Sequence, residues 1–185
     1  MFDGQGTAPW KPDCKDYKPL NVYGQTKLEG ELAVSQTLEK YFIVRIAWVF
    51  GLNGKNFIKT MLNVGKTHDT VRVVNDQIGT PTYARDLARA IFTAIYKGVV
   101  PGVYHFSDEG VCSWYDFAKA IHRIAGITTC KVSPLHTNEY PAKAPRPHYS
   151  VLDKTKIKTT YNIEIPHWEE SLEAVSYTHL TLPTT

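Results

Sequence analysis

Cysteine is scarce in this chain, and the few cysteines fall into no pattern. Cys14, Cys112 and Cys130 are far apart and form no Cys-x-x-Cys pair. An odd number of widely spaced cysteines argues against a disulfide framework or a zinc site and favours a reducing compartment. No apolar run approaches the roughly 20 residues of a membrane-spanning helix, and no signal peptide opens the chain. We therefore expect a cytoplasmic protein with no membrane partner.

Charge of one sign is not concentrated anywhere either. The formal net charge is +3 over 185 residues, and the basic residues are scattered rather than gathered into runs. Nucleic-acid-binding domains normally carry a basic patch or stripe, so we expect no nucleic-acid partner. The composition is otherwise that of an ordinary soluble globular protein, with 43% hydrophobic and 21% charged residues.

Apolar spacing predicts helices and strands that alternate along the chain. Helices are expected over residues 22–41, 56–66, 82–97 and 114–125, with shorter ones beginning at 153 and 167. Strands are expected over residues 42–50, 71–74, 102–107 and 130–135. The strand over 42–50 is almost continuously apolar, which is typical of a buried parallel strand. The alternation predicts the α/β class with a mostly parallel sheet.

Two of the expected helices carry recognisable start signals. Thr82 is a suitable N-cap for the third helix. Ser113 can cap the fourth, and Asp116 stands at the third helical position in a capping-box arrangement. Both helices are expected to end at glycine, at Gly98 and Gly126 respectively.

Tyrosine and lysine are spaced four apart at two places, Tyr23/Lys27 and Tyr115/Lys119. Residues so spaced share a helical face, so a phenol and an ammonium can converge on one ligand. A neighbouring cation also helps a phenol, whose ordinary pKa is about 10, to lose its proton. The pattern indicates the acid/base centre of a nicotinamide-dependent reductase. About one match is expected by chance, so a packed Tyr beside a solvated Lys remains an alternative.

The surroundings of the two pairs differ. Tyr23 stands at the start of its helix, after a loop rich in Gly and Pro, where a side chain can reach a cleft. Gly24 follows it and leaves room for the close approach of a ligand. Tyr115 and Lys119 instead fall on the polar shoulder of a helix whose core stripe includes Trp114. The first pair is therefore the candidate site.

Several segments, in the correct order, resemble the dTDP-4-dehydrorhamnose reductase family of extended short-chain dehydrogenases/reductases. The resemblance covers residues 1 to about 174 and the C-terminal two-thirds of the family sequence. The matching segments are 2–4 (Phe-Asp-Gly), 19–31 (Pro-Leu-Asn-Val-Tyr-Gly-Gln-Thr-Lys-Leu-Glu-Gly-Glu), 45–51 (Arg-Ile-Ala-Trp-Val-Phe-Gly), 56–61 (Asn-Phe-Ile-Lys-Thr-Met), 75–82 (Asn-Asp-Gln-Ile-Gly-Thr-Pro-Thr), 102–106 (Gly-Val-Tyr-His-Phe) and 146–147 (Arg-Pro).

The resemblance implies a division of the chain. Residues 1–97 are expected to be the remaining part of an NAD(P)-binding, Rossmann-like doubly wound parallel sheet that lacks its first βαβ units. Residues 98–175 would form mainly a smaller α/β substrate-binding domain. Residues 176–185 hold no charged residue and four threonines. We interpret them as a non-native tail, with a frayed natural C-terminus as the alternative.

The resemblance also implies roles for individual residues. The family residue matching Tyr23 donates a proton to the substrate carbonyl, and the one matching Lys27 binds the nicotinamide ribose, so both contact the cofactor. The matches at Trp48, Gln77 and Arg146 imply substrate-binding residues; Trp48 would pack on the sugar nucleotide, and Arg146 could pair with its pyrophosphate. A core aromatic, a turn residue and a solvated Arg are the respective structural alternatives.

Two parts of the family's active site find no match. No Gly-x-x-Gly-x-x-Gly loop occurs in the chain, and the Ser/Thr of the family's triad would precede Met1. We therefore expect an N-terminally truncated reductase that is inactive alone. The choice between NADPH and NADH stays open, because the residues that read the ribose would also lie upstream. The resemblance further leaves open a homodimer of the full-length protein with Mg²⁺ at its interface; no metal ligands are assigned in this chain.

The leading hypothesis is an oxidoreductase of dTDP-rhamnose biosynthesis. The parent enzyme would use NADPH or NADH to reduce the 4-keto group of dTDP-4-dehydro-L-rhamnose, giving dTDP-L-rhamnose. One alternative is a reductase, epimerase or dehydratase of a related nucleotide sugar. Another is a non-catalytic subunit resembling the regulatory beta subunit of methionine adenosyltransferase.

Overall fold

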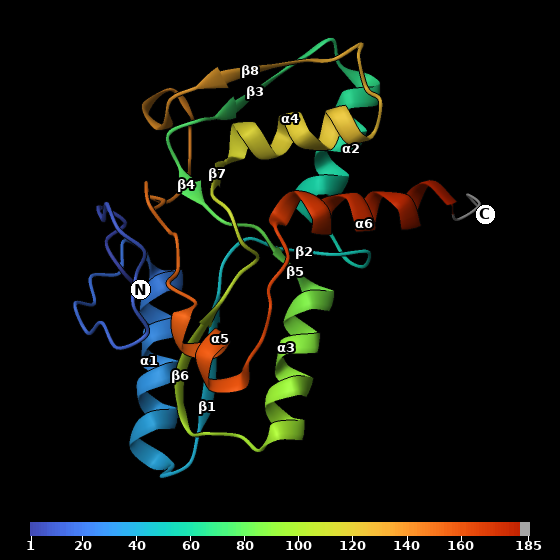
Figure 1. The fold of residues 1–185 in the computed structure, drawn as a ribbon. Coiled ribbons are helices and arrows are strands. Elements are labelled where there is room, and N and C mark those ends of the chain that lie inside the picture. The colour runs from blue at the N-terminus through green and yellow to red at the C-terminus, as the bar shows by residue number, and fades with distance from the viewer. Residues whose placement is uncertain (182–185) are drawn as a thin grey trace.

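The structure, a computed structural model, describes the backbone of residues 1–181 and the side chains of residues 1–175. Figure 1 shows two lobes, one above the other, joined by crossing segments. The lower lobe contains β1, β6, α1, α3 and α5, and the upper lobe contains β3, β8, α2 and α4. No helix in the described part of the chain combines the length and apolar character needed to cross a bilayer.

The lower lobe is built on two parallel strands. β1 (Phe42–Ile46) pairs with β6 (Gly102–Phe106), with Phe42 opposite Gly102. Around them lie α1 (Val22–Thr37), α3 (Ala84–Lys97) and α5 (Thr155–Tyr161) (Figure 1). Small residues on α3 allow close packing, because its Ala90 and Ala94 are buried one turn apart. The core of this lobe consists of Ala90, Ala94, Tyr104, Phe106, Ile157 and Tyr161.

The upper lobe repeats the parallel pairing. β3 (Thr70–Val74) pairs with β8 (Lys131–Leu135), and α2 (Phe57–Thr67) and α4 (Trp114–Ile124) pack against them. Helix α4 starts with the expected capping box between Ser113 and Asp116. Its apolar face joins a core that includes Ile58, Met61, Val73, Phe117 and Ile121.

Short strands cross between the lobes. β2 (Val49–Phe50) pairs in parallel with β5 (Thr82–Tyr83), whereas β4 (Ile78–Gly79) pairs antiparallel with β7 (Cys112–Ser113). A 3₁₀ turn, η1 (Thr137–Glu139), follows β8. Helix α6 (Trp168–Thr181) lies beside this junction (Figure 1). The expected α/β class with mostly parallel strands is confirmed.

Three expectations about individual elements are wrong. The single strand expected over 42–50 is interrupted at Ala47 and Trp48, because Trp48 has a left-handed backbone with φ +48°. The first helix ends at Thr37 rather than near Tyr41. Thr82 does not cap the third helix, which begins at Ala84. Gly98 does close that helix, with φ +88°.

Strand pairing joins residues from both sides of position 97. β1 lies before that position and its partner β6 after it, and the same holds for β3 and β8. The pairs thus join the two expected domains, and the division of the chain at residue 97 stays a prediction. Helix α6 extends to Thr181, and residues 182–185 lie outside the described part of the chain. The interpretation of residues 176–185 as a non-native tail likewise stays a prediction.

Candidate active site

A cavity of about 470 Å³ opens beside the first turns of α1. Its walls are the start of that helix, residues 44–47 at the end of β1, and residues from the segment 147–152. Of these four residues, three belong to β1 and Ala47 follows its end; within the described chain, β6 is the one strand paired with β1. The cavity thus lies at the carboxyl end of a parallel strand, where ligands of open α/β sheets usually bind.

Tyr23 and Lys27 both line this cavity, as their spacing on α1 predicts. The Lys27 ammonium lies 5.6 Å from the centroid of the Tyr23 ring, and 72% of Tyr23 is exposed. Within residues 1–175, Lys27 has no ion-pair partner. A phenol hydroxyl and a free ammonium on one wall fit the polar edge of a nicotinamide ribose, and they are available to it.

The start of α1 is fixed by Asn21. Its side chain accepts a hydrogen bond of 2.8 Å from the Gly24 N–H and donates one of 2.9 Å to the carbonyl of Pro145. Gly24 lines the cavity, but the interpretation of its missing side chain as room for a ligand stays a prediction. A Cβ at that position would lie 2.9 Å from the Met1 nitrogen and 3.3 Å from the Pro19 Cβ, so a larger residue would meet the chain itself.

The second Tyr/Lys pair has the same local geometry. The Lys119 ammonium lies 5.4 Å from the centroid of the Tyr115 ring, almost the distance found in the first pair. Neither residue lines the cavity beside α1. The contact between ammonium and ring therefore follows from helical spacing alone, and the cavity is what distinguishes Tyr23 and Lys27.

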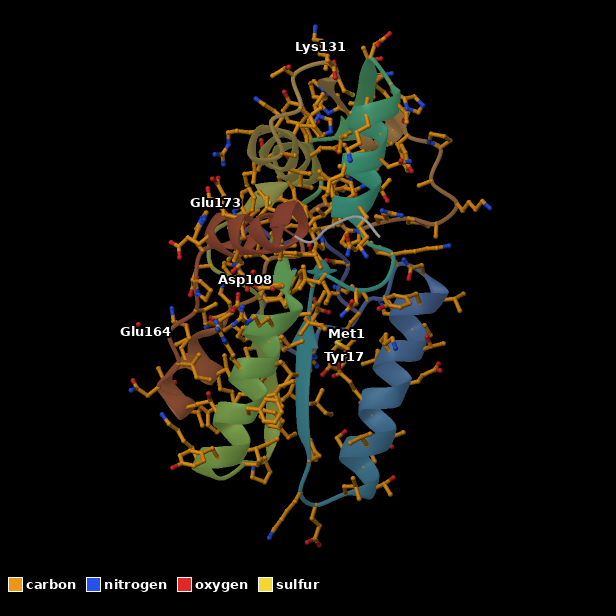
Figure 2. The ribbon with its side chains drawn as sticks, turned by 90° about the vertical axis from the view of Figure 1, so that its right-hand side faces the viewer. Met1, Tyr17, Asp108, Lys131, Glu164 and Glu173 are labelled. Atoms are coloured by element: carbon orange, nitrogen blue, oxygen red, sulfur yellow. The ribbon has the colours of Figure 1, made fainter. Side chains whose placement is uncertain are left out.

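Arg45, which lines the cavity together with Glu31, connects β1 to α1. Its guanidinium donates to both carboxylate oxygens of Glu31, with Nη2–Oε2 at 2.8 Å and Nε–Oε1 at 3.0 Å, and donates to the Tyr17 hydroxyl at 3.1 Å. Figure 2 shows Tyr17 beside Met1 in the space between β1 and α1. Burial by itself would lower the pKa of Arg45, but the hydrogen bonds to Glu31 and Tyr17 raise it overall. The sequence offers one signal for this network: Arg45 is the one charged residue in an apolar strand.

His105 completes the network on β6. Its Nδ1 lies 2.8 Å from the Trp10 carbonyl oxygen, and its Nε2 lies 3.3 Å from Arg45 Nη1. Because a carbonyl only accepts and a guanidinium only donates, the ring carries its proton on Nδ1. Burial, and then the Arg45 charge, lower the pKa of His105 to about 4. The imidazole is therefore neutral near pH 7.

Trp48 is not among the residues that line this cavity, so its binding role also remains a prediction; it follows Ala47, which does line the cavity, and it has an unusual backbone. Its φ of +48° is rare for a residue with a side chain and costs on the order of 1–3 kcal/mol. Its indole stacks on Trp114, with ring centroids 3.8 Å apart and planes 15° apart. A Cβ at residue 79 would lie 2.8 Å from this indole, so glycine is required there.

The other two residues expected to bind substrate lie elsewhere. Gln77 is 2% exposed, and its amide donates to the Thr137 hydroxyl at 3.1 Å. Arg146 is exposed in the loop after η1. Neither lines the cavity beside α1, so their binding roles remain predictions. No group of three His, Cys, Asp or Glu residues within the described chain is arranged to hold a metal ion.

Asp108, a buried carboxyl that belongs to no sequence motif, lies at the junction of the lobes. Asp108, just after β6, is fully buried; its Oδ2 accepts from the Tyr83 N–H at 3.0 Å. Its Oδ1 has no hydrogen-bond partner within the described chain. Burial raises the pKa of Asp108 to about 7, and the nearby Asp86 charge adds to this. Sequence reasoning missed this residue because nothing local marks it.

The fold has clear counterparts among known proteins. It matches that of a dTDP-4-dehydrorhamnose reductase from Clostridium acetobutylicum, with a TM-score of 0.90 and 45% identity over 98% of this chain and 63% of that one. A dTDP-4-dehydrorhamnose reductase from Bacillus anthracis, solved with NADP, gives a TM-score of 0.90 and 38% identity over 96% and 62%. Fold and neighbours define a Rossmann-like α/β protein of the short-chain dehydrogenase/reductase type.

Sequence similarity then identifies the family. The model of the RmlD substrate binding domain matches residues 1–180. The spore coat polysaccharide biosynthesis protein SpsK of Bacillus subtilis is 42% identical over 172 residues, which are 93% of this chain and 59% of SpsK. The chain belongs to the RmlD substrate binding domain family, and it spans about three-fifths of the length of these relatives.

Proposed function

We propose that these residues carry the catalytic Tyr/Lys pair of a reductase that converts dTDP-4-dehydro-L-rhamnose to dTDP-L-rhamnose with NADPH or NADH. One observation carries the proposal. Tyr23 and Lys27 stand together on the wall of a cavity of about 470 Å³ at the carboxyl end of β1. The names of the relatives support the substrate, since proteins 38% and 45% identical to this chain are dTDP-4-dehydrorhamnose reductases.

In this function the Tyr23 hydroxyl donates a proton to the carbonyl oxygen at C4 of the sugar. A nicotinamide cofactor held here would supply the hydride, which adds to the C4 carbon of that carbonyl. Lys27 holds the ribose hydroxyls and stabilises the phenolate that Tyr23 becomes. Glu31 and Arg45 keep α1 against β1, so that the phenol and the ammonium face the cavity. Positioned general acid catalysis of this kind typically contributes about 10²–10⁴-fold to the rate.

The described residues fit part of the cofactor. Tyr23 and Lys27 suit the nicotinamide ribose, whereas no Gly-x-x-Gly-x-x-Gly loop occurs in the 185 residues to hold a pyrophosphate. We therefore propose that this chain alone binds NADPH weakly and does not turn over. Measurable oxidation of NADPH by the isolated 185-residue chain would contradict this part of the proposal.

The test uses the whole protein with its upstream coding sequence restored. NADPH oxidation is followed with dTDP-4-dehydro-L-rhamnose, and Tyr23→Phe is compared with wild type. We expect kcat to fall by roughly 10²–10⁴-fold, because the variant keeps the ring and loses the proton donor. The matched control is Tyr115→Phe, which removes a hydroxyl from the other Tyr-x-x-x-Lys pair and should leave kcat near wild type.

Two outcomes would overturn the proposal. Near-full activity of Tyr23→Phe would exclude the proton-donor role. A restored protein that is inert with this substrate, but binds a partner enzyme in a pull-down with purified proteins, would favour a non-catalytic subunit. Activity with another nucleotide sugar in place of dTDP-4-dehydro-L-rhamnose would keep the acid/base role and change the substrate.

A further inference from the structure

The backbone at Trp48 is left-handed at the point where β1 ends and β2 begins. Its φ is +48°, and the other residue with a side chain that shares this sign within the described chain is Asn162, at the end of α5. Asparagine adopts this conformation readily at helix ends, whereas a tryptophan between two strands does not. Something in the structure must therefore hold Trp48 there, and such outliers often mark functional sites.

A single residue, Thr82, holds both peptide groups that flank the Trp48 Cα. Its hydroxyl donates to the carbonyl oxygen of Ala47, and its N–H donates to the carbonyl oxygen of Trp48 at 3.1 Å. The first peptide plane sets the φ of Trp48 and the second sets its ψ. Thr82 is fully buried, so these bonds form away from water.

Within residues 1–175, the hydroxyl of Thr82 makes no other hydrogen bond. A Thr just before a helix usually caps it, but α3 begins at Ala84 with Tyr83 as its N-cap and no side-chain cap bond. The hydroxyl points instead across the β2–β5 pair to the end of β1. The Thr82 hydroxyl therefore serves the backbone at Trp48 and not the start of α3.

The left-handed turn sets the place of the indole. It stacks on Trp114, whose own ring lies 4.7 Å from Phe57, and it passes so close to Gly79 that a Cβ there would meet it at 2.8 Å. The same Cβ would lie 2.6 Å from the Ser150 hydroxyl, a residue that lines the cavity beside α1. The indole is therefore held at the border of that cavity.

We propose that Thr82 is a positioning residue: it fixes Trp48 in the left-handed conformation, and so places the indole as an aromatic wall for the sugar nucleotide. The identity of the ligand rests on the proposed function. The fixing of Trp48 by Thr82 does not, because it rests on hydrogen bonds among residues 47, 48 and 82.

The first test is spectroscopic and uses the 185-residue chain. Two stacked indoles should give an exciton couplet in the circular dichroism spectrum, and Trp114→Phe, which abolishes the stack, identifies that signal. We expect Thr82→Val to lose most of the couplet while the helical signal stays unchanged, because valine keeps the shape and removes the donor. Thr82→Ser, which keeps a hydroxyl, should retain the couplet.

The second test measures binding of dTDP-L-rhamnose to the restored whole protein by calorimetry. A displaced indole gives up an aromatic contact, so Thr82→Val should bind about three- to tenfold more weakly than wild type and Thr82→Ser should not. With NADPH turnover as readout, the loss should appear mainly in KM and not in kcat.

The outcomes separate the two proposals. An unchanged couplet in Thr82→Val overturns the positioning role, whatever the protein binds. A lost couplet with unchanged affinity overturns the link between Thr82 and the ligand. If wild type fails to bind dTDP-L-rhamnose, the proposed function falls, and the couplet alone then decides whether Thr82 fixes Trp48. Loss of both couplet and affinity in Thr82→Val, with rescue by Thr82→Ser, supports the proposal.

Discussion

Arg45 connects β1 to α1 through its ion pair with Glu31. Its side chain is 8% exposed and that of Glu31 is 17% exposed, so the ion pair is largely shielded from water. A buried pair need not add net stability, yet removing one partner leaves a charge that is costly to bury. The pair therefore acts as a fixed connection between β1 and the helix that carries Tyr23 and Lys27.

Replacing Glu31 by alanine should expose this dependence. We expect Glu31→Ala to lower the free energy of unfolding by about 3 kcal/mol, since Arg45 stays buried without its carboxylate. Urea unfolding followed by circular dichroism measures the change. Glu29→Ala on the same helix is the control: Glu29 is exposed and bonded to Gln25, and its loss should cost under about 0.5 kcal/mol. Equal effects of the two variants would contradict the role of the ion pair.

Helix α4 begins with a capping box made by residues close together in the sequence. The Ser113 hydroxyl accepts from the Asp116 N–H at 3.1 Å, and Asp116 Oδ2 accepts from the Ser113 N–H at 2.9 Å. Each side chain thus satisfies a backbone donor that the helix cannot bond itself. Helix α4 also carries Trp114, so the cap helps to fix the ring on which Trp48 stacks.

Ser113→Ala should therefore destabilise the chain by about 1 kcal/mol, the usual effect of losing a serine cap. Thermal or urea unfolding gives the value. Ser35→Ala in the last turn of α1, where the hydroxyl donates to the Leu32 carbonyl, serves for comparison and should change stability by less than about 0.5 kcal/mol. If Ser113→Ala were equally harmless, the capping box would contribute nothing.

At the scale of the whole molecule, two buried titratable groups, Asp108 and His105, change the stability of the fold in opposite directions as the pH changes. Figure 2 shows Asp108 at the level where α3 meets the upper lobe. The pKa of Asp108 is about 7, above the ordinary 3.8, so the folded state binds this proton more tightly than the unfolded state. The stability that results is lost as the pH rises through 7. His105, with a pKa of about 4 against 6.5, loses stability as the pH falls below 6.5. Between pH 5 and 6.5 the two effects oppose each other.

Asp108→Asn should uncover the histidine effect. We expect the variant to lose about 2 kcal/mol of unfolding free energy between pH 6.5 and pH 5, while wild type changes by less than about 1 kcal/mol. Urea unfolding at several pH values in that range gives both profiles. Asp13→Asn, which alters an exposed carboxylate, should keep the wild-type profile. A flat profile for Asp108→Asn would show that His105 does not titrate as described.

Much of the fold could be predicted because its signals are local. The capping box at Ser113 and Gly98 after α3 each act within a few residues, and their helices begin or end close to the expected positions. Thr82 shows the limit of such reasoning. A threonine can cap a helix or donate a hydrogen bond to a distant carbonyl. The pairing of β2 with β5 brings the Thr82 hydroxyl to the Ala47 carbonyl, and so decides for the second role.

The sequence by itself determined the α/β class, the order of the elements and the candidate pair Tyr23/Lys27, because periodicity and helical spacing are properties of neighbouring residues. The tertiary structure decided which Tyr/Lys pair lies in a cavity, since both pairs have the same local geometry. It also decided the left-handed turn at Trp48 and the burial of Asp108. These features depend on contacts between segments far apart in the chain, and no local pattern encodes them.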